Sequence, residues 1–148
     1  MYLTKPASAV PFGHWTSFHS AAAGGVRRLK VSSGVPQANM FYEEVAETKV
    51  VWFGVLPGEI LLEFDLKDKK VSFPMWSSKT RIERLKKINP ELLGDVEPRS
   101  VNWQQFKELF LPILTSEQKV VGVNLSGKNL TGIDMPASLL VKQVEAFW

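Results

Sequence analysis

The feature that most constrains the fold is a run of three strand-like segments in residues 50–76. The first segment, residues 50–56, is apolar except at Gly54, which is typical of a strand covered on both faces. Pro57 and Gly58 follow it and favour a type II turn, because they supply the backbone conformations of its two central positions. We therefore expect this strand to lie in the middle of a sheet and the chain to reverse after it.

The next two segments alternate between apolar and polar side chains. In residues 60–66 the alternation places Glu63 and Asp65 on a solvated face, and residues 71–75 alternate in the same way after a polar turn. Together the three segments predict an antiparallel meander. Because Pro74 has no backbone N–H, the third strand should have an open side there or end there.

Length and charge set broad limits on the protein. The 148 residues are enough for one domain, the chain has no cysteine, and no apolar run approaches the roughly 18 residues that span a bilayer. The net charge of +3 arises near the N-terminus, since residues 1–42 carry four basic side chains and no acidic one, whereas residues 43–148 carry 14 basic and 15 acidic side chains. The overall charge therefore gives no support to polyanion binding by the body of the protein.

The N-terminal segment, residues 1–36, is rich in Ala, Ser, Gly and Pro and has no sustained periodicity. We interpret it as a disordered extension, or as residues encoded ahead of a true start at Met40. The alternative is an organelle transit peptide, because serines are common in it and acids are absent. Residues 37–148 are predicted to form a single domain.

Residue types exclude several classes of chemistry. The only histidines, His14 and His19, lie in the N-terminal segment, so the predicted domain contains neither His nor Cys. This excludes a Ser-His-Asp triad, a Cys-His pair and the usual zinc sites from it. We predict no catalytic residue, no metal and no cofactor, and an enzyme based on carboxylates such as Glu43, Glu47 or Asp134 remains an alternative.

Two helices are predicted around the meander. Residues 37–48 form a short amphipathic helix with an acidic face, which we interpret as a solvated surface. Residues 79–88 form a second helix, for which Thr80 and Glu83 predict a capping box. This helix has a basic face that includes Lys79, Arg81, Arg84, Lys86 and Lys87.

Farther along, Pro98 is assigned to an irregular connection, and Asn102 with Gln105 predicts the start of a stronger helix. Pro112 should kink or end this helix near Leu111. Its apolar stripe, suited to cover the sheet, is Trp103, Phe106, Phe110 and Ile113.

A strand over residues 119–125 contains a near match to a phosphate-binding loop. The match runs from Gly122 to Lys128, but Asn129 replaces the required hydroxyl residue, and strand alternation continues past Gly122. We therefore interpret residues 126–129 as a hairpin turn into a further strand, followed by a last helix that opens at Pro136.

Several segments share a pattern of mainly apolar residues: Val51, Trp52, Phe73, Pro74, Met75, Trp76, Ser77, Pro98, Val101, Phe106, Leu111, Pro112 and Leu114, with a final strand pair followed by a Leu-rich helix. In this pattern the chain resembles a family of small bacterial proteins known as domain of unknown function 2750. The resemblance covers roughly residues 40–147 and implies a fold but no established activity.

We predict an α+β fold with an antiparallel sheet of about five strands and helices packed mainly on one face. The favoured function is a non-enzymatic binding or interaction module of the bacterial cytoplasm, with an unknown protein as partner. Weak binding of nucleic acid through the basic helix is the alternative, and an organelle location follows if residues 1–36 are a transit peptide. The predicted contact residues are Pro74, Trp76, Ser77, Lys79, Arg81, Arg84 and Lys87.

Overall fold

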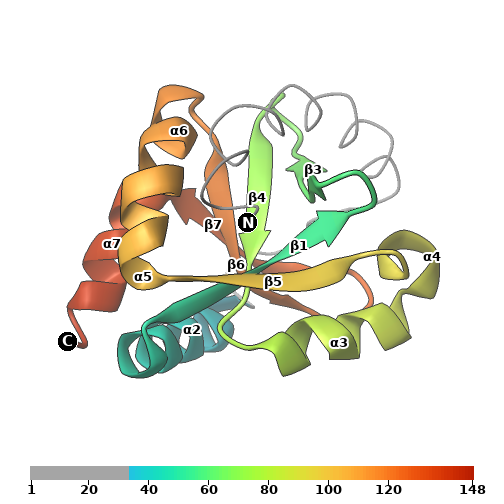
Figure 1. Cartoon of the computed structure of the whole chain (residues 1–148), viewed down its shortest axis with the longest axis horizontal. Helices are drawn as coiled ribbons and strands as arrows, with labels where there is room; N and C mark the ends of the chain where they lie inside the picture. Colours follow the sequence, from blue (N-terminus) through green and yellow to red (C-terminus); the bar gives the residue numbers. More distant parts are fainter. Residues whose placement is uncertain (1–33) are drawn as a thin grey trace.

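The computed structural model describes residues 34–148 (Figure 1), so the predictions made for residues 1–33 lie outside the described part of the chain. The described helices are α2 (Val35–Thr48), α3 (Lys79–Ile88), α4 (Pro90–Leu93), α5 (Trp103–Gln105), the π-helix η3 (Phe106–Phe110), α6 (Leu111–Ser116) and α7 (Ala137–Glu145). The strands are β1 (Val50–Leu56), β2 (Ile60–Leu61), β3 (Phe64–Asp65), β4 (Val71–Met75), β5 (Glu97–Asn102), β6 (Val120–Ser126) and β7 (Thr131–Pro136).

The strands form two sheets. The first has the order β2-β1-β5 and is antiparallel throughout, and the second has the order β3-β4-β6-β7 with β4 and β6 parallel. The sheets meet where the backbones of Trp52 and Trp76 exchange two N–H···O bonds of 2.8 Å. The predicted α+β class is confirmed, with two sheets of three and four strands in place of one sheet of about five.

The predicted meander is divided between these sheets. Residues 60–66 form two short strands, because β2 pairs with β1 and β3 pairs with β4. Between them the N–H of Leu62 still donates to the carbonyl of Gly54, at 2.9 Å. The irregular backbone changes which side chains face inward, and Glu63, predicted to be solvated, is fully buried.

The segment around Pro98 is a strand, and its assignment to an irregular connection was wrong. β5 pairs with β1 over six residues, with Pro98 opposite Gly54. Trp103 N–H donates to the carbonyl of Lys49, so by the alternation of an antiparallel ladder the Pro98 nitrogen faces away from β1. A proline is tolerated on this outer side of an edge strand, where no donor is required.

The helix that begins at Trp103 is confirmed, including its capping box. Asn102 Oδ1 accepts from the N–H of Gln105 at 2.7 Å, and Gln105 Oε1 accepts from the N–H of Asn102 at 3.2 Å. The helix does not end near Leu111, because the π-helix η3 leads directly into α6 and Pro112 falls in the first turn of α6. The wider π turn shifts the apolar stripe by one residue, and Leu114 is buried in place of Ile113.

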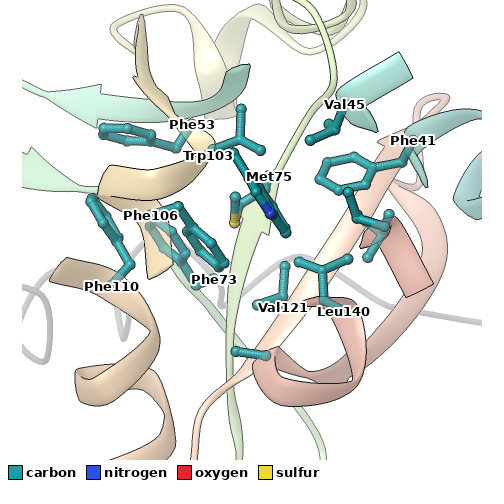
Figure 2. Close-up of a cluster of buried hydrophobic side chains, with 14 of the residues drawn as sticks. Phe41, Val45, Phe53, Phe73, Met75, Trp103, Phe106, Phe110, Val121 and Leu140 are labelled. Carbon is teal, nitrogen blue, oxygen red and sulfur yellow. The ribbon is translucent and has the colours of Figure 1, made fainter. Parts of the chain in front are cut away.

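Two apolar clusters form the core. Figure 2 shows the larger one, in which side chains from α2, β1, β4, α5, η3, β6 and α7 meet. Its rings pack closely, and the centroids of Phe53 and Phe110 are 5.4 Å apart. The second cluster lies under α3 and α4 and contains Phe64, Trp76, Ile82 and Leu85. Helices therefore cover both clusters, and α3 lies on the side away from α7 (Figure 1).

Candidate binding surface

Helix α3 has the bounds expected from the sequence. It spans Lys79–Ile88 and buries Ile82 and Leu85 in the second apolar cluster. Its N-cap is Ser78, and no side-chain hydrogen bond is made there, so the predicted capping box of Thr80 and Glu83 is not formed. The helix is therefore positioned by its apolar face and by the residues that precede it.

The exposed face of α3 is basic. Lys79, Arg84 and Lys87 are exposed and Lys86 is partly buried. Lys79 lies 3.9 Å from the carboxylate of Glu83, a weak exposed pair. Within residues 34–148 no ion pair is found for Arg84, Lys86 or Lys87. We call the exposed side of the helix that carries Arg84, Lys86, Lys87 and Ile88 the α3 surface.

Arg81 belongs to a polar network instead of this surface. Its Nη2 lies 3.1 Å from Glu44 Oε2 on α2, and its Nε donates to Ser77 Oγ at 3.1 Å. Ser77 Oγ in turn donates to the Glu44 carboxylate. Burial raises the pKa of Glu44, but the hydrogen bonds from Ser77 and Arg81 and the charge of Arg81 outweigh it and hold the pKa below 4.5. The network fixes the N-terminal end of α3 to α2.

Asn124 completes this network from β6. Its Oδ1 accepts from the N–H of Ser77 at 2.9 Å, and its Nδ2 donates to the carbonyl of Gln37 at 3.2 Å. Asn124 has a φ of 47° and lies where the β6–β7 register shifts. A left-handed residue inside a strand is strained, and here the bulge aims its buried amide at α2 and α3. The sequence carried no signal for this role beyond the asparagine itself, one of the residue types that tolerates a left-handed backbone.

The other predicted contact residues underlie the surface. Pro74 is buried opposite Gly122 of the parallel strand β6, and β3 does not reach it on the other side. The Trp76 side chain is 1% exposed, and its Nε1 donates to the carbonyl of Leu125 at 2.9 Å. Ser77 is buried in the network. Of the predicted contact residues, the structure therefore brings Lys79, Arg84 and Lys87 to the exposed face and uses Pro74, Trp76, Ser77 and Arg81 to hold that face in place.

The candidate carboxylates are dispersed. Glu43 and Glu47 are exposed on α2, whereas Asp134 lies on β7 and accepts a hydrogen bond of 2.7 Å from Ser72. Among residues 34–148 there is no group of three or more acidic or imidazole side chains that could hold a metal ion. In the same part of the chain, no helix is both long and apolar enough to cross a membrane.

Comparison with known proteins agrees with the resemblance seen in the sequence. No curated protein matches the chain. A family model described as "Protein of unknown function (DUF2750)" matches residues 38–144. The match begins within α2, ends within α7 and includes all the elements between them. The match covers well over half of the chain. The chain therefore belongs to the DUF2750 family.

Proposed function

We propose that the protein is a non-enzymatic binding module that docks an acidic protein partner on the α3 surface. The observation that carries this proposal is that Arg84, Lys86 and Lys87 lie on one short helix and form no ion pair among residues 34–148. Arg84 and Lys87 point outward, and no carboxylate within the described residues pairs with them or with Lys86. A partner that brings carboxylates to this face would supply that complement.

The way in which α3 is held also supports a docking role. Ile82 and Leu85 fix its inner side in the core, and the network of Ser77, Asn124 and Glu44 fixes its first turn. A helix that is already ordered loses little conformational entropy on binding, so more of the contact energy appears as affinity. The α3 surface is therefore a pre-organised platform.

The composition of the surface favours a protein over nucleic acid as the partner. Glu83 lies among the cations, and Ile88 is 40% exposed at the end of the helix. A mixture of apolar and charged contacts is typical of protein interfaces, whereas a phosphate backbone selects for continuous positive charge. Residues 43–148 have a net charge of −1, so the body as a whole does not attract polyanions.

Charge reversal tests the proposal. Affinity purification from the native host would compare the full chain with R84E/K87E and with K67E/K142E, a variant with the same change in charge at two exposed lysines away from α3. We expect a set of proteins that bind the full chain and K67E/K142E but do not bind R84E/K87E. Equal recovery by all three proteins would contradict the proposal. If the material lost by R84E/K87E is nucleic acid, released steeply as salt rises, the partner class is wrong.

A further inference from the structure

A cavity of about 550 Å³ is separate from the α3 surface, since none of its lining residues belongs to α3. Three segments that are distant in sequence form its walls: the turn before β4, the connection from α6 to β6, and the first turn of α7. The parallel register of β4 and β6 brings the first two together, because Ser72 lies beside Val120. The volume falls in the range typical of small-ligand sites.

Lys119 is the buried charge of this cavity. Its side chain is 7% exposed, and its Nζ lies 2.7 Å from Oε2 of Glu63, which is fully buried beneath it. The carboxylate of Glu117 lies 3.0 Å from the same Nζ. Among residues 34–148, Lys119 therefore has one carboxylate partner fixed in the interior and another at the rim of the cavity.

The two partners of Lys119 are not equivalent. Glu63 is fully buried with the Lys119 ammonium group, so separating the two charges is costly, whereas the Glu117 side chain is 43% exposed and its pairing contributes little. An anion that enters the cavity can take the place of Glu117, which then turns to solvent. Glu63 holds Lys119 in position throughout the exchange.

The opposite wall supplies further cations. Lys69 and Lys70 line the cavity from the turn before β4, where Asp68 offsets one of their two charges, and Ser138 lines it with a hydroxyl group from α7. Leu114 and Ala137 are buried and give the wall an apolar part. Cationic and hydroxyl groups around a small apolar patch suit a ligand with a carboxylate or phosphate on a short carbon skeleton.

We propose that this cavity is a binding site for a small carboxylate or phosphate compound, in which Lys119 contacts the anionic group in exchange for Glu117 and Lys69 and Lys70 balance its charge. The inference is independent of docking on α3, because the two sites share no residue. It also assigns a role to the Glu63–Lys119 pair, which the binding-module proposal does not use.

Amide chemical shifts of the full-length protein, followed by NMR, test the site with inorganic phosphate and citrate as probes and sodium chloride of equal ionic strength as the control. We expect saturable shifts at Lys69, Lys119 and Ser138, with affinity on the order of millimolar for such small ligands. Saturation by phosphate alone or by citrate alone would identify the ligand class. Shifts that follow ionic strength only, or no shifts with either probe, would overturn the proposal.

Variants of the lining residues distinguish a ligand-binding role from a purely structural role of these side chains. E117Q removes the competing carboxylate and should bind the active probe about threefold more tightly, in keeping with the small value of an exposed pair. K69A/K70A should bind it about tenfold more weakly, because contacts to charged groups are lost. R84E/K87E should bind it like the unmodified protein. Unchanged or weaker binding by E117Q would contradict the exchange at Lys119.

Discussion

The ammonium group of Lys119 lies 2.7 Å from the carboxylate of Glu63, and both side chains are buried. Glu63 belongs to the irregular backbone between β2 and β3, and Lys119 directly precedes β6. The pair therefore ties the point where the chain leaves one sheet to the start of a strand in the other. Its presence follows from the division of residues 60–66 between two sheets.

Breaking this pair should be more damaging than replacing it. We expect E63M and K119M each to lower the free energy of unfolding by about 3–5 kcal/mol, because each removes one member of a buried ion pair and leaves the other charge in the interior. The double variant E63M/K119M should be destabilised less than either single variant. Equilibrium unfolding in urea, followed by tryptophan fluorescence, measures all three. Additive losses would show that the two charges do not compensate each other.

The strained backbone at Asn124 gives a second prediction. N124A loses the hydrogen bonds to Ser77 and Gln37 and keeps the left-handed backbone, so we expect a loss of about 2–4 kcal/mol. N124G loses the same bonds but adopts a positive φ without strain, and should be more stable than N124A by about 1 kcal/mol. Urea unfolding compares the two proteins. Equal stability would argue against backbone strain at this position.

Gly122 should not tolerate a side chain. A Cβ atom there would lie 2.9 Å from Ser72 Oγ and 3.1 Å from Asp134 Oδ1, so it would disturb the hydrogen bond between them. We expect G122A to lower the free energy of unfolding by about 1–3 kcal/mol. G127A is a useful comparison, because a Cβ at Gly127 meets no atom within 4 Å and only its φ of 78° opposes the change. Thermal unfolding of both variants checks the expectation, and an unaffected G122A would contradict it.

Acid should weaken the contact between α7 and the helix that begins at Trp103. Hydrogen bonds from Lys107 and then from Trp103 hold the pKa of Glu145 below its ordinary value of 4.5. A carboxylate whose pKa is lowered on folding stabilises the protein above the unfolded-state pKa, and this contribution is lost as the pH falls through the folded-state pKa. We therefore expect stability to decline below about pH 4.5, and to decline less in E145Q.

Urea unfolding at a series of pH values gives this comparison. E43Q is the matched control, since it removes an exposed carboxylate on α2 that lacks such contacts. An acid-dependent loss of stability that is the same in E145Q and in the unmodified protein would contradict the role of Glu145.

The sequence predicted the elements whose signals are local. The bounds of α3 and the capping box at Asn102 follow from side chains within one or two turns of helix, and both were correct. The predictions for Pro98 and Glu63 were wrong because of tertiary contacts. Pro98 lies in a strand because β5 pairs with β1, and Glu63 is buried at the break between β2 and β3, which pair with different strands. The π-helix η3 was also not predicted. It precedes Pro112 and lets the helix continue, and the spacing of apolar residues in the sequence does not indicate a π turn.

The part of the candidate surface that depends on local signals was predicted, and the part that depends on tertiary contacts was not. The basic residues of α3 could be assigned from helical periodicity, which places Arg84 and Lys87 away from Ile82 and Leu85. Periodicity gave no information on Glu44 and Asn124, which reach Arg81 and Ser77 from other elements. The missing N–H of Pro74 suggested an open strand edge that would present Trp76, but the backbone pairing of Trp52 with Trp76 buries this side chain.

The most direct test of docking on α3 is site-specific photocrosslinking in the native host, with a photoreactive amino acid in place of Lys87 and, as a control, in place of Lys67. We predict a discrete protein adduct at position 87 that disappears when R84E is added, and no such adduct at position 67. Adducts of equal yield at both positions, or none at position 87, would contradict a binding role for the α3 surface.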